Sequence, residues 1–293
     1  MEKFGNRLRL KVCKSYFYTQ LQRVIQTLGI LCFALLIGTE DSFAGHLAER
    51  LASFPQWDKP SVQTAKGDLV YPAWMAGSWN VTSTLIDAVA PLAPDIVSPG
   101  FASNRQNLHQ PVSFSVKFIE DRRLKSLLPF ATSVTRSQIV ADRAFNGLSL
   151  AHAILGDRNV LAVKVDPHSP NRQITLLKGD RQLVSIVSGR TTETPKERQF
   201  ITTEVFKQFF RDADARPYFN EVESTTAYHY LEQSQPTIAA DQVTAVYLSP
   251  QDPNYFTAGS RPVALYRYRL EFTPIDVAID LTKTPNKENL SAD

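Results

Sequence analysis

The chain of 293 residues has only two cysteines, Cys13 and Cys32, and both lie within its first 44 residues. If that segment is removed on export, the remaining protein has no thiol, no disulfide and no cysteine ligand for a metal. Cys32 also lacks the small preceding residue of a lipoprotein acceptor, because Leu31 stands before it. The stability of the folded part must therefore come from a packed core.

Net charge is nearly absent as well. The first 44 residues hold six of the 32 Lys and Arg residues and three of the 29 Asp and Glu residues, so 26 of each sign remain. A domain without excess positive charge lacks the electrostatic field that draws proteins to nucleic acid or to an acidic membrane surface. We therefore expect no nucleic-acid partner.

Catalytic and metal-binding motifs are missing too. The chain has no G-x-S-x-G, no G-x-G-x-x-G and no phosphate-binding loop. The five histidines are His46, His109, His152, His168 and His229. None of them has the H-E-x-x-H or i, i+4 spacing of metal ligands. We expect no cofactor and no metal, and an enzyme is the least supported of three function classes.

The N-terminal segment is typical of an export signal. Six Lys and Arg residues, the last of them Arg23, precede an apolar stretch at 28–38, and Ser42-Phe43-Ala44 forms a small-x-small cleavage site before Gly45. An apolar stretch this short cannot cross a hydrocarbon core, which needs about 17–25 residues. We expect export with removal of residues 1–44, and an uncleaved N-terminal anchor is the alternative.

The rest of the chain is dominated by apolar residues at every second position, as at 112–118 and 266–272. Further strands are expected at 79–86, 148–155, 160–166, 172–178, 182–189, 200–205, 222–231 and 243–249. The short turns between them favour an antiparallel meander over βαβ units. We expect a mainly β fold whose meander closes into a barrel over 71–274. A helical, Pro-rich arm at 45–70 precedes it and a flexible tail at 275–293 follows.

Two connections stand out. The segment 87–111 is rich in proline and long for a compact domain, and loops of this kind often cover functional sites. We expect it to form a lid over one end of the barrel. Asn146-Gly147 is a strong signal for a type I′ turn, so 142–147 is expected to join two strands. The alternative is that this segment lines a ligand site.

The sequence YPAWMAGSW contains Gly77 and Trp79, a Gly-x-Trp at the start of the first long strand. It resembles the N-terminal motif of the calycins, the lipocalin-like barrels. The resemblance implies a calycin-like β-barrel in which Trp79 closes the barrel floor and an arginine from a late strand, Arg267 or Arg269, covers the indole. A guanidinium on an indole face contributes about 0.5–2 kcal/mol.

Longer stretches, among them YPAWMAGSWNVTSTL, ADRAFNGLSLA and RPVALYRYRLEF, resemble an uncharacterised family found in cyanobacteria and chloroplasts with lumenal targeting. The resemblance covers nearly the whole chain after residue 44. It implies a single β-rich domain located in the thylakoid lumen or the periplasm, and it brings no established catalytic residues. The long basic N-terminal region fits a bacterial export signal better than a Ser-rich transit peptide.

Tyrosines recur in the expected late strands. They are Tyr228, Tyr230, Tyr247, Tyr266 and Tyr268. If several share the barrel interior, they form a cavity with apolar walls and hydroxyl tips, suited to an elongated amphipathic, pigment-like or lipid-like ligand. Arg105 and His109 in the long loop are further candidates for ligand contact. The alternative is that the tyrosines fill the core, as inward residues of small barrels commonly do.

Two function hypotheses follow. The first is an exported, non-catalytic binding protein for a small apolar ligand, held between the tyrosine interior and the 87–111 loop; it requires a cavity of about 300 Å³ or more. The second is an accessory or assembly factor that binds a membrane protein complex in the same compartment. Its anchors are Trp57 in the Pro-rich arm and Tyr255 in the 249–256 loop, because exposed aromatic residues serve as interface hot spots.

Overall fold

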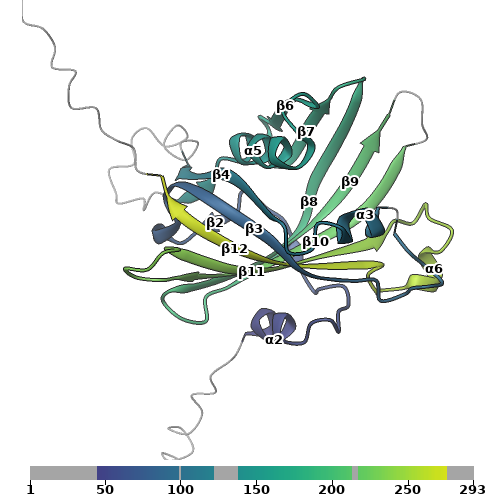
Figure 1. Ribbon diagram of the computed structural model, residues 1–293, viewed down its shortest axis with the longest axis horizontal. Coiled ribbons are helices and arrows are strands. Elements are labelled where there is room, and N and C mark those ends of the chain that lie inside the picture. The colour runs from purple at the N-terminus through teal and green to yellow at the C-terminus, as the bar shows by residue number, and fades with distance from the viewer. Residues whose placement is uncertain (1–44, 99, 122–137, 213–216, 276–293) are drawn as a thin grey trace, which may run out of the picture. The chain divides into compact units, whose positions relative to one another are not determined.

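The computed structural model describes residues 45–98, 100–121, 138–212 and 217–275 (Figure 1). The expected signal segment at 1–44 and the expected tail after residue 275 lie outside the described residues. The helices are α2 (His46–Ala52), η1 (Ala73–Met75), α3 (Phe101–Arg105), α5 (Arg143–Leu155) and α6 (Tyr255–Ala258). None of these described helices combines the length and the apolar character needed to span a membrane.

Twelve antiparallel strands form one sheet in the described part of the chain. They are β1 (Gln63–Thr64), β2 (Val70–Tyr71), β3 (Gly77–Val89), β4 (Pro111–Glu120), β5 (Ile139–Ala141), β6 (Val160–Asp166), β7 (Ser169–Leu177), β8 (Arg181–Glu193), β9 (Gln199–Arg211), β10 (Tyr218–Tyr230), β11 (Ile238–Leu248) and β12 (Ala264–Pro274). Each strand from β6 to β12 pairs with the next along the chain; β12 pairs with β3, and β4, β5 and β2 follow. The strands at the two ends, β2 and β6, each pair with one neighbour, so the sheet is a half-barrel (Figure 1). The predicted mainly β, antiparallel meander is confirmed.

The predicted strand at 148–155 is wrong, and so is the predicted turn at Asn146-Gly147. Residues 143–155 form helix α5 instead. The carboxylate of Asp142 accepts a hydrogen bond from the backbone N–H of Phe145 (3.1 Å), which caps the first turn of the helix. This cap starts a helix at the point where the sequence suggested a hairpin. The other expected strands are all found.

The face of the half-barrel that faces α5, here called the inner face, carries the largest buried cluster. Its members are Met75, Trp79, Val81, Val116, Phe118, Ile139, Ile238, Ala240, Leu270 and Phe272. The indole N–H of Trp79 donates to the carbonyl of Met75 (2.9 Å), which fixes the ring at the start of β3. Gly77, at φ +122°, allows the chain to turn from η1 into that strand.

The expectation that Arg267 or Arg269 covers Trp79 is wrong. The register of β12 against β3 places these arginines opposite Asp87 and Thr84, at least five residues from Trp79. At a rise of about 3.3 Å per residue, that separation is too long for a side chain to bridge. Arg267 instead donates to Asp241 (Nε to Oδ1, 3.0 Å), and its guanidinium lies 5.4 Å from the ring centroid of Phe54.

The N-terminal arm covers the opposite, outer face of the sheet, so that α2 and α5 lie on opposite sides of it (Figure 1). Leu47, Leu51 and Trp57 are buried there against β11 residues including Val243. The backbone N–H of Leu47 donates to Glu193 Oε1 (2.9 Å), which ties the start of α2 to β8. The arm is therefore part of the packed structure.

A single carboxylate, that of Glu223, organises the contact between arm and sheet. It is completely buried, and it accepts hydrogen bonds from Arg50 Nη2 (2.9 Å), Trp57 Nε1 (2.9 Å), the Tyr247 hydroxyl (2.7 Å) and the Thr225 hydroxyl (2.7 Å). A buried charge is tolerated when it is paired and hydrogen-bonded in this way. Trp57 is only 7% exposed, so the expectation that it is an exposed interface anchor is wrong.

The long segment at 87–111, expected to form a lid, packs against residues of β11 and β12. After β3 ends, Leu92 packs against Leu248 and Val263, and the ring of Phe101 in α3 lies 5.9 Å from that of Tyr266. The segment is thus anchored by buried apolar side chains. It does not reach the cavity described below, whose cover is α5.

Replacing Glu223 by Gln should lower the free energy of unfolding by about 3 kcal/mol or more, because Arg50 would then be buried without a counter-charge. The matched control is Glu221→Gln on the same strand. Its ion pair with Lys59 (3.0 Å) is partly exposed, so we expect a loss below about 1 kcal/mol. Urea unfolding measures both values, and equal losses would contradict the importance assigned to Glu223.

Candidate functional site

Helix α5 lies across the open side of the half-barrel. It contacts β4 on one side and β6 and β7 on the other. None of its side chains is fully buried, although the helix contacts three strands. The helix therefore spans the gap between the two ends of the sheet without filling the space beneath it.

Polar side chains fasten α5 to the edge of β4, where β5 pairs only with residues 118–120. The amide of Asn146 accepts a hydrogen bond from the backbone N–H of Lys117 (2.7 Å) and donates one to the carbonyl of the same residue (3.0 Å). The hydroxyl of Ser149 accepts from the N–H of Ser115 (2.9 Å). Two side chains of the helix thus satisfy backbone groups that an edge strand leaves open.

Gly147 lies against the end of the Gln173 side chain on β7. A Cβ atom at this position would lie 2.8 Å from Nε2 of Gln173, closer than real Cβ atoms come to other atoms. The pair Asn146-Gly147, which suggested a turn, serves instead to dock the helix on the two sides of the half-barrel.

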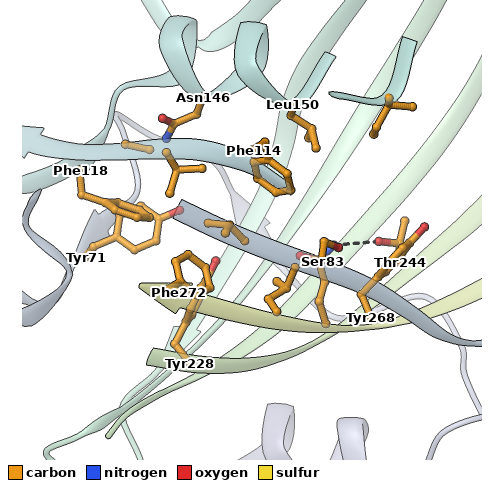
Figure 2. Close-up of a pocket in the computed structure, with 16 residues that line it drawn as sticks. Tyr71, Ser83, Phe114, Phe118, Asn146, Leu150, Tyr228, Thr244, Tyr268 and Phe272 are labelled. Carbon is orange, nitrogen blue, oxygen red and sulfur yellow. Dashed lines mark hydrogen bonds between the residues drawn. The ribbon is translucent and has the colours of Figure 1, made fainter. Parts of the chain in front are cut away.

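Between α5 and the inner face lies a cavity of about 350 Å³ (Figure 2). Its apolar lining residues are Val81, Phe114, Val116, Phe118, Ala141, Leu150, Ile154, Leu270 and Phe272. Its polar lining residues are Tyr71, Ser83, Asn146, Tyr228, Gln242, Thr244 and Tyr268. None of these 16 residues carries a charged side chain.

Tyrosines stand at both ends of the cavity. Figure 2 shows Tyr71 and Tyr228 at one end and Tyr268 beside Thr244 at the other. Burial raises the pKa of Tyr71, and the neighbouring Tyr228 and Glu204 add to the shift. Burial likewise raises the pKa of Tyr228, and it raises the pKa of Tyr268 to about 12. All three hydroxyls therefore keep their protons at neutral pH.

Two of these hydroxyls have no hydrogen-bond partner within the described ranges, namely those of Tyr71 and Tyr268. The amide of Gln242 is differently placed: it accepts from the Thr226 hydroxyl (3.3 Å) and donates to that of Thr244 (3.2 Å). The cavity thus offers free O–H groups within a neutral lining that is mostly apolar.

An ionic network lies beside the cavity at the start of α5. Arg143 donates to Asp68 (Nε to Oδ1, 2.8 Å) and to Glu204 (Nη2 to Oε1, 3.0 Å), and Arg190 donates to the same oxygen of Glu204 (2.6 Å). Burial alone would lower the pKa of Arg143, but the carboxylates of Glu204 and Asp68 raise it above its usual value. These charges are paired with one another, and none of the four side chains lines the cavity.

The structure brings only two of the expected ligand-binding residues to the cavity, Tyr228 and Tyr268. Tyr230 lies two residues beyond Tyr228 on β10, but its ring packs on Trp74, with ring centroids 5.7 Å apart. Tyr266 lies under α3, where its hydroxyl accepts a hydrogen bond from Asn104 (3.2 Å).

The remaining expected residues lie elsewhere. Tyr247 is on the outer face, where its hydroxyl donates to Glu223. Arg105, the last residue of α3, and His109 are both exposed on the 87–111 segment and do not line the cavity. Tyr247 therefore stabilises the arm, and the two loop residues are separate from the cavity.

The expectation missed Tyr71, Phe114 and the contribution of α5. The signal for α5 is present in the sequence: Asn146, Leu150 and Ile154 are spaced four residues apart, and Asp142 precedes them as a cap. Phe114 belongs to the strand alternation that was recognised, but its neighbours across the cavity come from α5. Only the three-dimensional arrangement links these segments.

A family model described as Domain of unknown function (DUF6816) matches residues 63–276. The match includes every strand of the sheet and α5, whereas Arg50 and Trp57 of the arm precede it. Comparisons with curated proteins and with solved structures found no match. The calycin relationship and the cyanobacterial or chloroplast origin stay predictions.

Replacing Asn146 by Ala should lower the free energy of unfolding by about 1–3 kcal/mol, because the N–H of Lys117 loses its acceptor. The carbonyl of Lys117 keeps the hydrogen bond from the backbone N–H of Asp142 (2.9 Å). Hydrogen exchange should report the change locally, as faster exchange of the Lys117 amide. The control is Asn80→Ala, which removes an exposed hydrogen bond to Ser115 on the same strand. Unchanged protection of Lys117 in Asn146→Ala would show that the side chain does not secure this edge.

Proposed function

We propose that this chain, which belongs to the family described as Domain of unknown function (DUF6816), is an exported, non-catalytic binding protein for a small apolar or amphipathic ligand. The observation that carries the proposal is the cavity of about 350 Å³ between α5 and the inner face. Sites for small molecules are concave and mostly apolar, with a few placed polar groups and volumes of about 300–1,000 Å³. The lining described above has this composition.

The exposure of α5 supports the same proposal. Leu150 and Ile154 line the cavity, yet they are 39% and 64% exposed. A ligand in the cavity would cover part of this apolar surface, and such burial is favourable by about 25 cal/mol per Å² before the entropic cost of association is subtracted. The tyrosine hydroxyls keep their protons and the neighbouring charges are paired, which suits binding better than acid–base catalysis.

The compartment is part of this proposal. The basic stretch, the short apolar stretch and the small-x-small site before Gly45 support export. The resemblance to lumenal proteins points to the thylakoid lumen or the periplasm. A carrier in such a compartment would meet apolar molecules at the adjoining membrane.

An accessory factor for a membrane protein complex is the second candidate. Trp57 no longer supports it, since that side chain is buried. Phe256 in α6 supports it, because this ring is 90% exposed and packs only edge-on against Tyr255, with centroids 5.3 Å apart. An exposed aromatic side chain of this kind is a typical interface anchor.

Replacing Leu150 by Trp should fill the cavity and abolish ligand binding. Leu150 lines the open space of the cavity, so the larger ring can extend into that space without overpacking the core. Native mass spectrometry of protein purified from its own compartment measures the bound molecule. Leu155→Trp is the control, since Leu155 is 45% exposed on the same helix and does not line the cavity. Retention of a ligand by Leu150→Trp, or its absence from the unmodified protein, would contradict the proposal.

For the second candidate, Phe256→Ser should abolish co-purification with a membrane complex, because the interface would lose its aromatic anchor. The control is Leu161→Ser on β6, which removes another side chain that is 66% exposed. Quantitative mass spectrometry of affinity-purified material compares the two variants. Equal recovery of the same partners with both would eliminate this surface.

A further inference from the structure

We infer that the ligand of this cavity is an uncharged molecule with an apolar body and at least one oxygen-bearing group, such as a ketone, an ester or an alcohol. The inference rests on the proposed binding function and adds the chemical class of the ligand. Two independent features of the cavity carry it: the lack of charge in its lining and the free hydroxyls at its ends.

The first feature excludes ions. The 16 lining residues include no Asp, Glu, Lys, Arg or His, so an ion entering the cavity would lose its hydration without gaining a counter-charge. Arg143 and Arg190 of the neighbouring network are held by Glu204 at 3.0 and 2.6 Å. A ligand carboxylate would therefore have to compete with a protein carboxylate for these guanidinium groups. Fatty acids and other carboxylates are disfavoured on this ground.

The second feature favours an oxygen-bearing ligand. Within the described residues the hydroxyls of Tyr71 and Tyr268 lack a hydrogen-bond partner, and both belong to the lining. Both side chains are partly buried and line the cavity, so their hydroxyls are open to it and can donate to water or to a ligand oxygen there. A carbonyl or hydroxyl oxygen accepts from a tyrosine O–H without requiring any charge. Apolar side chains, among them Val81 and Leu270, also line the cavity. They suit the apolar body of the ligand, whereas the tyrosine hydroxyls suit its oxygen.

Three probes of nearly equal size test the class: 2-acetylnaphthalene, a ketone; 2-ethylnaphthalene, a hydrocarbon; and 2-naphthoate, an anion at pH 7. Calorimetric titration of the exported protein gives the three dissociation constants. One added hydrogen bond corresponds to a factor of about five in affinity. We expect the ketone to bind about fivefold more tightly than the hydrocarbon, and the carboxylate to bind most weakly.

The double variant Tyr71→Phe/Tyr268→Phe keeps both rings and removes both hydroxyls. We expect its affinity for 2-acetylnaphthalene to fall about fivefold, to that for the hydrocarbon, while its affinity for 2-ethylnaphthalene is unchanged. The control is Tyr230→Phe, whose hydroxyl lies outside the lining, and it should change neither value. A retained hydrocarbon affinity shows that the double variant is folded.

The outcomes separate this inference from the binding function. If 2-naphthoate binds as tightly as the ketone, or if ketone and hydrocarbon bind equally to the unmodified protein, the ligand class is wrong and the binding function stands. Equal loss of ketone and hydrocarbon affinity in the double variant would show that the hydroxyls maintain the cavity and do not bond the ligand, which also overturns the class. If none of the three probes binds, both the class and the binding function fail.

Discussion

Two hydrogen bonds between the amide of Asn146 and the backbone of Lys117 take the place that a neighbouring strand would fill on β4. The peptide groups at a sheet edge need partners, and the side chains of α5 provide them. This contact fastens the first turns of the helix to β4, and the cavity lies beneath the turns that follow. Without it, the inner face between β4 and β6 would be an open trough of apolar side chains. The proposed site therefore depends on how one strand edge is completed.

Among the described residues, the two buried glutamates, Glu223 and Glu204, belong to two networks on opposite faces of the sheet. On the outer face, Glu223 gathers four donors and holds the arm; on the inner side, Glu204 joins Arg143 and Arg190 and holds the start of α5. In each network opposite charges neutralise one another, which makes their burial tolerable. The space between them can consequently be lined by neutral groups alone. The equal numbers of acidic and basic residues after the first 44 fit this arrangement.

Most of the strands could be predicted because period-two alternation is a local property of the sequence. The candidate site could be predicted only in part, since alternation tells which residues of one strand share a face but not how two strands are aligned. Tyr228 lies opposite Ala240 on the inner face, whereas Tyr247 lies opposite Glu221 on the outer face, and only the cross-strand register decides this. Asn146-Gly147 misled for a related reason: its local preference for a turn yielded to the cap at Asp142 and to docking on β4. The buried indole of Trp57 donates its N–H to Glu223, which lies 166 residues further along the chain. No local sequence pattern reveals such a contact.

The fastening of α5 is uneven along its length. Its hydrogen bonds to strands, as far as the described residues go, come from positions up to Ser149, whereas Leu150 and Ile154 line the cavity from the second half. Fraying of a final helical turn costs much less free energy than opening a sheet. A guest molecule could thus enter and leave on a timescale set by this one segment, while the global unfolding rate of the domain stays low. Separate substitutions would then change the residence time of the ligand and the thermal stability of the domain.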